Sequence, residues 1–276
     1  MKIKFLGTAA AEAMPALFCD CENCRRAREL GGRNYRTRSQ TVIDEDLMID
    51  LPSDTLCHIW QYNIDLLKIK HLLITHTHSD HFYPTELNWL RGNGYSHPPK
   101  DWYGITVYGN EHVGNGLKDI LDSSDGKVKY CKLKPFIPVK IGDYTVTALN
   151  ALHGAPNSYI YIIEKNGSKL LYAHDSDIFP EDTWKYIETK SIKFDAVSLD
   201  CTEGAYEKLD YKGHMCLGIN KNCKSRLIEI GAADRKTKFI LNHFSHNGLS
   251  SAYTDFCLLA EPDNFIVSYD GMEFDL

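Results

Sequence analysis

The chain has 276 residues, and its shares of hydrophobic (43%) and charged (25%) residues are ordinary for a globular protein with a large core. The formal net charge is −6 and no segment is dense in Lys and Arg, which disfavours binding to extended nucleic acid. No apolar run approaches the length of a membrane span and polar residues interrupt the first seven positions, so we expect a cytoplasmic protein that does not bind membranes.

Short apolar runs alternate with turn residues and helical patterns along the whole chain, without a linker or a repeat, so we expect a single domain over residues 1–276. The first half predicts strands at 2–6, 41–43, 47–50, 71–75 and 105–108, and helices at 52–62, 84–91 and 111–121. The second half predicts strands at 139–141, 144–149, 159–164, 169–172, 196–199, 238–241 and 265–268, and helices at 181–189, 215–230 and 253–259. Ser53 or Asp54 is expected to cap its helix. Two strand-rich halves separated by helices favour an α/β protein in which two sheets pack together beneath outer helices.

The segment 76–81, with the sequence HTHSDH, follows an apolar strand directly. Three imidazoles and a carboxylate so close together do not help a core, whereas metal ions require such clusters. Alternate residues of an extended segment face the same way, so His76 and His78 can reach one cation. Asp80 and His81 come after the chain turns and can reach a second.

Neither pair completes a coordination sphere, so further ligands must come from distant parts of the sequence. His153, Asp175 and His243 are candidates, because each comes just after a predicted strand. Any one of them alone is also explained as an ordinary polar residue at a strand end, and only their joint appearance favours a metal centre.

Nine cysteines are spread unevenly, and Cys19, Cys21 and Cys24 form a CxCxxC motif. Three thiolates need one more ligand to complete a tetrahedral zinc site, and His246, three residues after His243, is well placed to supply it. The alternative is three unrelated core cysteines. The default interpretation of the remaining six is that they are small buried hydrophobic residues.

The order of these motifs resembles that of the metallo-β-lactamase superfamily over nearly the whole chain, from the FLGTA segment at 5–9 to His243. The resemblance implies a four-layer αββα sandwich with a binuclear metal centre at the sheet edges. It implies His76, His78 and His153 on one cation, Asp80, His81 and His243 on the other, and Asp175 as the bridge.

One branch of the superfamily, the phosphoribosyl 1,2-cyclic phosphate phosphodiesterases of the carbon–phosphorus lyase pathway, shares further features with the chain. Its members resemble the chain in two features. The first is a CxCxxC zinc motif completed by a histidine, and the second is a histidine just before a long helix in the C-terminal part, which is His214 here. The chain departs from that pattern at 176–177 and at 95–103, and the second segment is expected to line the substrate pocket. On the residues alone, His214 is also explained as a helix-capping or solvent-exposed histidine.

The function implied by this resemblance is hydrolysis of a small cyclic phosphodiester, of the phosphoribosyl cyclic phosphate or 2′,3′-cyclic nucleotide type. A metal-bridged hydroxide would attack phosphorus, and His214 would act as the general acid. Asp80 is the second catalytic residue expected, because it holds one of the two cations. Asp200 and Glu203 are expected to orient the ligating imidazoles.

The sequence leaves several alternatives open. Two active-site cations, Zn²⁺ or Mn²⁺ with Fe²⁺ also compatible, would accompany one structural Zn²⁺. Other functions on the same fold are an RNA phosphodiesterase of the tRNA 3′-processing type, a thioester or lactone hydrolase, and a non-catalytic binding protein of the pyrroloquinoline-quinone biosynthesis type. The oligomeric state is also open, with a homodimer among the options.

Overall fold

The computed structural model describes residues 1–92 and 95–276 and contains two seven-stranded sheets. The first sheet has the order β14-β1-β2-β3-β4-β5-β6 and the second the order β13-β12-β11-β10-β9-β8-β7. The strands of the first sheet are β1 (Lys2–Gly7), β2 (Gln40–Ile43), β3 (Leu47–Ile49), β4 (His71–Leu73), β5 (Ile105–Gly109), β6 (Val128–Lys132) and β14 (Glu273–Asp275). Those of the second are β7 (Val139–Ile141), β8 (Tyr144–Asn150), β9 (Tyr159–Lys165), β10 (Ser168–Ala173), β11 (Ala196–Asp200), β12 (Lys238–Asn242) and β13 (Ile266–Val267).

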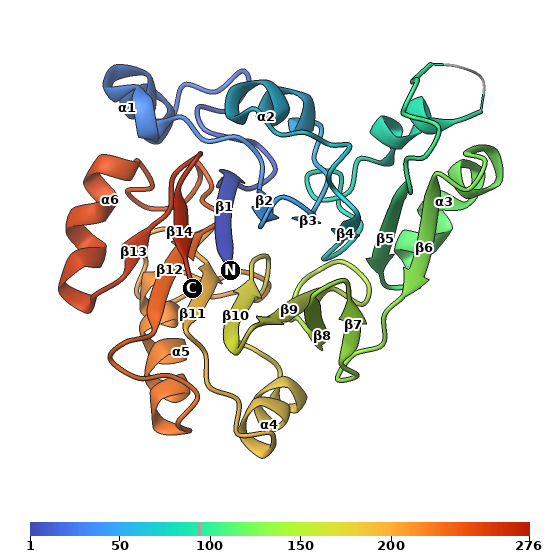
Figure 1. The fold of residues 1–276 in the computed structure, drawn as a ribbon. Helices are drawn as coiled ribbons and strands as arrows, with labels where there is room; N and C mark the ends of the chain where they lie inside the picture. Colours follow the sequence, from blue (N-terminus) through green and yellow to red (C-terminus); the bar gives the residue numbers. More distant parts are fainter. Residues whose placement is uncertain (93–94) are drawn as a thin grey trace.

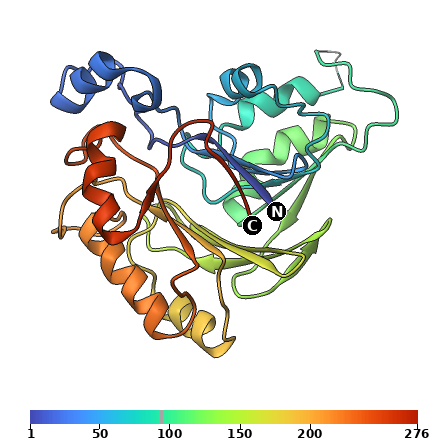
Figure 2. The same cartoon turned by 60° about the vertical axis from the view of Figure 1, so that its left-hand side comes forward.

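Helices cover the outer faces of the two sheets. They are α1 (Glu22–Leu30), α2 (Thr55–Tyr62), α3 (Glu111–Ser123), α4 (Glu181–Thr189), α5 (Leu217–Glu229) and α6 (Tyr253–Ala260), with short 3₁₀ segments η1 (Gly32–Asn34), η2 (Pro84–Leu90) and η3 (Glu261–Asp263). Helices α4, α5 and α6 lie outside the second sheet, and α2 and α3 lie outside the first (Figures 1 and 2). The expected four-layer αββα sandwich is therefore confirmed. Along the described residues, no helix is both long and apolar enough to span a lipid bilayer.

Three apolar clusters hold these layers together. One lies between the sheets and includes the fully buried side chains of Phe5, Tyr161 and Tyr172. The other two lie beneath the outer helices, around Trp184 on one side and Leu117 on the other. The hydrophobic effect at both faces of both sheets therefore fixes how their edges meet.

Parallel strand pairs set the direction of the polypeptide at the functional edge. Strands β3, β4, β5 and β6 pair in parallel, and so do β10, β11, β12 and β13. Because the carboxyl ends of parallel strands share one edge of a sheet, the loops after β4, β10 and β12 emerge side by side. The hairpin between β9 and β10 turns at Asn166 and Gly167, both with positive φ as an Asn-Gly turn requires.

The structure corrects several predicted elements. The segment predicted as a helix at 84–91 is the 3₁₀ segment η2, and α1, β6 and β14 were not predicted. Asp54 is the N-cap of α2, but its side chain makes no capping hydrogen bond. Its carboxylate instead accepts from Nη1 of Arg38 at 2.8 Å, so an ion pair replaces the expected cap.

Candidate metal centre

Four of the predicted ligands lie where strands end. His76 comes after β4, His153 after β8, Asp175 after β10 and His243 directly after β12. Asp175 and His243 have φ angles of 57° and 62°, in the left-handed region that residues other than glycine rarely adopt. Such conformations persist only where surrounding contacts fix them, and they occur mainly at functional sites.

The side chains of the seven predicted ligands gather into two groups that share Asp175. Within each group, one ligand atom per residue lies within 4.8 Å of all the others. The groups are His76, His78, His153 and Asp175, and Asp80, His81, Asp175 and His243. The structure thus brings together every residue predicted for the active centre, in the expected division, while their role as ligands stays a prediction.

The spacing of the donor atoms fits divalent cations. Oδ2 of Asp175 lies 3.1 Å from Nε2 of His76, 3.2 Å from Nε2 of His81 and 3.3 Å from Nε2 of His153. A tetrahedral cation with Zn–N bonds of about 2.0–2.1 Å keeps its ligand atoms about 3.3 Å apart. Oδ1 of Asp175 is buried and makes no well-aligned hydrogen bond among the described residues, although Nδ1 of His214 lies 3.1 Å away.

The protonation states also suit metal binding. Burial and the nearby charge of His81 lower the pKa of His76 to about 4. Burial acts to raise the pKa of Asp80 and of Asp175, but the surrounding histidines outweigh it and hold both below the ordinary value. At neutral pH the centre therefore presents a neutral imidazole at His76 and ionised carboxylates, the forms that ligate metals. Burial acts to lower the pKa of His81 and of His243, but nearby carboxylates outweigh it and raise both, so a cation would have to displace a proton from these two imidazoles.

Asp50 fixes the orientation of His81. Its Oδ2 lies 2.7 Å from Nδ1 of His81, and its carboxylate also accepts from the N–H and hydroxyl of Thr75. All three residues are buried. A hydrogen bond at Nδ1 leaves Nε2 free for a cation, as at many metal sites. No local pattern in the sequence points to this role of Asp50, because an aspartate at a strand end resembles a turn residue.

Thr202 and Asp200 hold His243 in a similar way. The hydroxyl of Thr202 lies 2.9 Å from Nδ1 of His243 and donates to Oδ2 of Asp200 at 2.9 Å. Asp200 was predicted to orient an imidazole, and its Oδ2 lies 3.3 Å from Nδ1 of His243. Glu203 was expected to do the same, which is wrong. Its carboxylate lies beside Tyr211 and, with burial, raises the pKa of that phenol.

His214 lies at the rim of the centre, with 24% of its side chain exposed. Its Nδ1 is 3.1 Å from Oδ1 of Asp175 and 3.4 Å from Oδ2 of Asp200. Burial lowers its pKa, but the two carboxylates outweigh burial and raise it to about 11. The carbonyl of the preceding residue, Gly213, lies 3.0 Å from Nδ1 of His153, so the loop carrying His214 contacts a predicted ligand.

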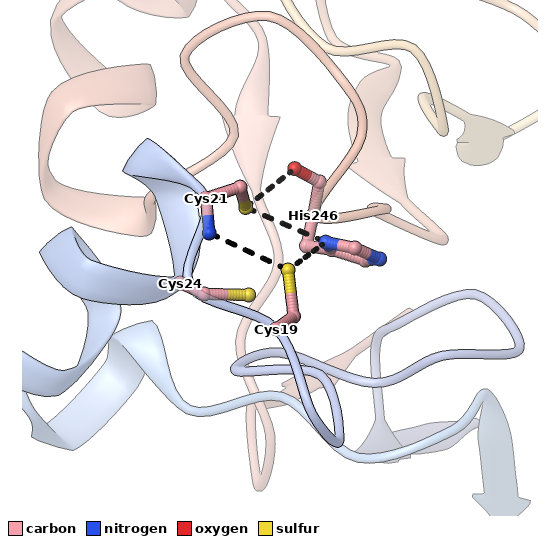
Figure 3. A group of neighbouring side chains, drawn as sticks. All are labelled: Cys19, Cys21, Cys24 and His246. Atoms are coloured by element: carbon pink, nitrogen blue, oxygen red, sulfur yellow. Dashed lines mark hydrogen bonds between the residues drawn. The ribbon is translucent and has the colours of Figure 1, made fainter.

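A second cluster combines Cys19, Cys21, Cys24 and His246, whose ligand atoms lie within 4.8 Å of one another (Figure 3). Nδ1 of His246 is 3.3 Å from Sγ of Cys19 and 3.5 Å from Sγ of Cys21. Tetrahedral Zn²⁺ with bonds of about 2.3 Å to sulfur and 2.0–2.1 Å to nitrogen would keep such atoms about 3.6 Å apart. The N–H of Cys21 lowers the pKa of the Cys19 thiol, which favours the thiolate that zinc binds.

Cys24 lies within the first turn of α1. Burial raises the pKa of its thiol to about 12, so a cation is needed to hold it as a thiolate. Asn23 connects this turn to the segment that carries His246, because its side-chain amide donates to the carbonyls of His246 and Gly248. Among the six other cysteines expected to be buried, Cys57 is exposed and two more are only partly buried, namely Cys131 and Cys257.

A family model described as the beta-lactamase superfamily domain matches residues 56–244, which is more than half of the chain. The chain belongs to this superfamily.

Two curated relatives share part of its sequence. A ribonuclease Z from Staphylococcus carnosus is 29% identical over 183 residues, covering 62% of this chain and 55% of the relative. An octanoyltransferase from Porphyromonas gingivalis is 27% identical over 170 residues, covering 56% of this chain and 31% of the relative. The matched region thus spans about half of the first relative and about a third of the second.

Solved structures share the fold of this superfamily member along its whole length. Zn²⁺-bound PqqB from Methylobacterium extorquens superposes with a TM-score of 0.75 at 17% identity, covering 100% of both chains. A diphosphatase of the PhnP family superposes with a TM-score of 0.74 at 18% identity, covering 100% of this chain and 97% of that one. Human tRNase Z, short form, gives 0.66 at 16% identity, covering 100% and 99%.

Segment 95–103 was expected to line the substrate pocket. Its residues instead line two hollows whose walls contain none of the predicted ligands of this superfamily member. The indole of Trp102 and the hydroxyl of Tyr103 both donate to the carbonyl of Leu67, which holds the segment against the residues that follow α2.

Proposed function

We propose that the protein is a binuclear metal-dependent phosphodiesterase that cleaves small cyclic phosphodiesters. The phosphoribosyl cyclic phosphate and 2′,3′-cyclic nucleotide types are the substrates that we expect. The observation that carries this proposal is the position of His214, which lies beside the centre with two carboxylates at its Nδ1. A thioester hydrolase expels a thiolate and has less need for a protonated imidazole at this place.

The two donor groups that share Asp175 would hold two cations, with Zn²⁺, Mn²⁺ and Fe²⁺ all compatible with imidazole and carboxylate ligands. When bound, such cations supply water activation at neutral pH and neutralise phosphoryl charge. Asp50 and Thr202 keep His81 and His243 oriented toward the shared carboxylate. The protein thereby fixes the ligand geometry before a substrate enters.

His214 would supply the proton that the leaving oxygen needs. Asp200 is fully buried and remains ionised, so it can hold Nδ1 of His214 even when Asp175 binds cations. Contact at Nδ1 leaves Nε2 of His214 for the substrate. General acid catalysis of this kind typically contributes about 10²–10⁴-fold to the rate. The leaving alkoxide of a cyclic phosphodiester is a poor leaving group and gains most from it.

The comparisons support phosphate ester chemistry at a coarse level. One structural neighbour is a diphosphatase of the PhnP family, and one curated relative is a ribonuclease Z. Small substrates agree better than tRNA with the net charge of −6, because RNA binding relies on clusters of Lys and Arg. A metal-dependent hydrolase is the coarser assignment that family membership itself supports.

The deciding experiment compares substrates with poor and good leaving groups in the metal-loaded protein. We expect His214→Ala to lose about 10²-fold or more in kcat/KM on a cyclic nucleoside phosphate, and much less on bis(nitrophenyl) phosphate, because nitrophenolate leaves without a proton. Equal losses on both substrates would refute the proton-donor role.

Metal content is the necessary control, because Asp175, Asp200, His214 and His243 also form a group whose ligand atoms lie within 4.8 Å. If His214 is a proton donor, His214→Ala retains the full metal content of the parent. A loss of one metal equivalent would instead assign His214 as a ligand and overturn the proposed mechanism.

Ribonuclease Z activity is the second candidate, favoured by the 29% identity to the S. carnosus enzyme. A parallel assay of precursor tRNA, cyclic phosphodiesters and an acyl thioester separates the options. Turnover of precursor tRNA at a higher kcat/KM than the cyclic substrates would select this alternative. Absence of turnover on all three by fully metal-loaded protein would favour a non-catalytic binding protein.

A further inference from the structure

An apolar cavity of about 590 Å³ lies between α2, η2 and the segment 96–102, with β3 and β5 at its base. Its volume falls within the range of about 300–1,000 Å³ that small-molecule sites occupy. The aliphatic residues of the wall are Met48, Leu51, Leu56, Ile59, Leu66, Leu67, Leu87, Leu90 and Ile105. So many alkyl groups, with few polar ones, suit an alkyl chain better than a nucleobase or a sugar.

The rim of this cavity exposes large apolar side chains. Leu56, Leu67 and Trp89 are 46%, 43% and 50% exposed, and Tyr95 beside Trp89 is 67% exposed. Contiguous exposed apolar surface of this kind marks binding sites on soluble proteins. Two of the polar groups are already engaged, since the hydroxyl of Thr55 donates to the carbonyl of Pro52 and Glu86 accepts from the indole of Trp89. The rim therefore offers apolar contact area rather than hydrogen bonds.

A second hollow of about 630 Å³ shares Ser96, His97, Pro98 and Trp102 with the apolar cavity and is basic. Its charged residues are Arg91, Lys100, Lys127, Lys129 and a single carboxylate, Asp125. Across residues 1–92 and 95–276, none of the four cations forms an ion pair, and Nε of Arg91 is buried without a hydrogen-bond partner. This unneutralised positive charge favours an anionic group next to the alkyl site.

We propose that the protein binds a medium-chain fatty acid here, with its alkyl chain in the apolar cavity and its carboxylate in the basic hollow. This site is separate from the metal centre and goes beyond the proposed phosphodiesterase function. The two are close, because the N–H of Leu51 donates to the carbonyl of His81 and the carbonyl of Leu51 accepts from Tyr83. One wall of the cavity is thus bonded to a segment that carries a predicted metal ligand.

The test measures binding of sodium hexanoate, octanoate, decanoate and dodecanoate to the full chain by calorimetry, at concentrations below micelle formation. Each added CH₂ should tighten Kd about fourfold until the cavity is filled. Decanol, which lacks the charge, should bind at least tenfold more weakly than decanoate. Affinity that does not depend on chain length, or decanol that binds as tightly as decanoate, would overturn the proposal.

Two variants locate the site, and each has a matched control. Leu56→Glu places a charge at the apolar rim and should weaken decanoate binding at least tenfold, whereas Leu258→Glu on α6, where Leu258 is 70% exposed, should not. Lys127→Glu should weaken decanoate at least tenfold and leave decanol unchanged, whereas Lys236→Glu should affect neither. Parental affinity in both Leu56→Glu and Lys127→Glu would place the binding elsewhere and refute the site.

Binding is measured without substrate or turnover, so its outcome is independent of the phosphodiesterase assay. All four positions are at least partly exposed, and thermal unfolding of each variant should match that of the parent. A variant that loses binding while unfolding at the parental temperature supports the site.

Discussion

Replacement of Asp200 by Asn should lower the stability of the protein and shift the alkaline limb of its pH–activity profile to lower pH. Oδ1 of Asp200 accepts from the N–H groups of Thr202 and Met215 at 3.0 and 2.8 Å. Oδ2 accepts from the N–H of Asp175 at 3.1 Å and from the hydroxyl of Thr202. The amide nitrogen of Asn must therefore face at least one backbone N–H that then has no acceptor, whichever way it is turned.

A buried donor left without an acceptor costs about 1–3 kcal/mol, and losing hydrogen bonds to a charged group costs about 1.5–3 kcal/mol. We therefore expect the free energy of unfolding to fall by about 2–5 kcal/mol. In a chain of this size, that corresponds to a Tm lower by about 3–9 °C. Thermal and urea unfolding of metal-free Asp200→Asn and parent protein measure this difference.

The same substitution should change the pH profile, because Asp200 helps to raise the pKa of His214. A general acid must be protonated, so activity falls as pH rises through its pKa. In Asp200→Asn this falling limb of kcat/KM should move to lower pH. Asp195→Asn is the control, since Asp195 is an exposed carboxylate that accepts from the N–H of Lys169. Equal Tm values and an unmoved limb in Asp200→Asn would refute the reasoning.

Three further outcomes are expected. Cys21→Ser should bind one zinc equivalent fewer and unfold at a lower temperature, whereas the exposed control Cys57→Ser should keep both properties; equal metal content in the two variants contradicts the zinc site. Asp80→Ala should abolish turnover because one cation loses a ligand, whereas the control His112→Ala should keep a near-parental rate. A near-parental rate in Asp80→Ala would contradict the two-metal centre. In metal-free protein, the pKa of His214 lies above its ordinary 6.5, so its contribution to stability is fully present below pH 6.5 and is lost as pH rises toward 11. The difference in unfolding free energy between parent and His214→Gln should shrink over that window, and a constant difference would contradict it.

The sequence predicts most of the fold because apolar periodicity records which face of a strand or helix is buried. The prediction fails for elements that bury few residues, because their apolar pattern is weak. Helix α1 buries only Cys24 and Ala27, and the side chain of its N-cap, Cys21, makes no capping hydrogen bond. Neither a start signal nor an apolar stripe therefore marks the helix in the sequence. Strand β14 has no buried residue and exists only because it pairs with β1 across the length of the chain.

The sequence also predicts part of the site, namely the residues proposed as metal ligands but not those that orient them. The predicted ligands could be named because the clustered histidines of segment 76–81 are rare outside metal sites, and because His153, Asp175 and His243 appear together, each just after a predicted strand. Asp50 and Thr202 could not, since each acts through one contact with a distant histidine, His81 or His243. Such contacts depend on tertiary packing and leave no local pattern in the sequence.

The two donor groups combine residues from both halves of the chain, so they cannot form until most of the protein has been synthesised. His81 and His243 are separated by 162 residues. At about 5–20 residues per second, a ribosome needs roughly 10–30 s to synthesise that interval. Until Asp175 is synthesised, the N-terminal half presents His76, His78, Asp80 and His81 without the shared carboxylate. The second donor group would then stay incomplete until His243, directly after β12, has emerged.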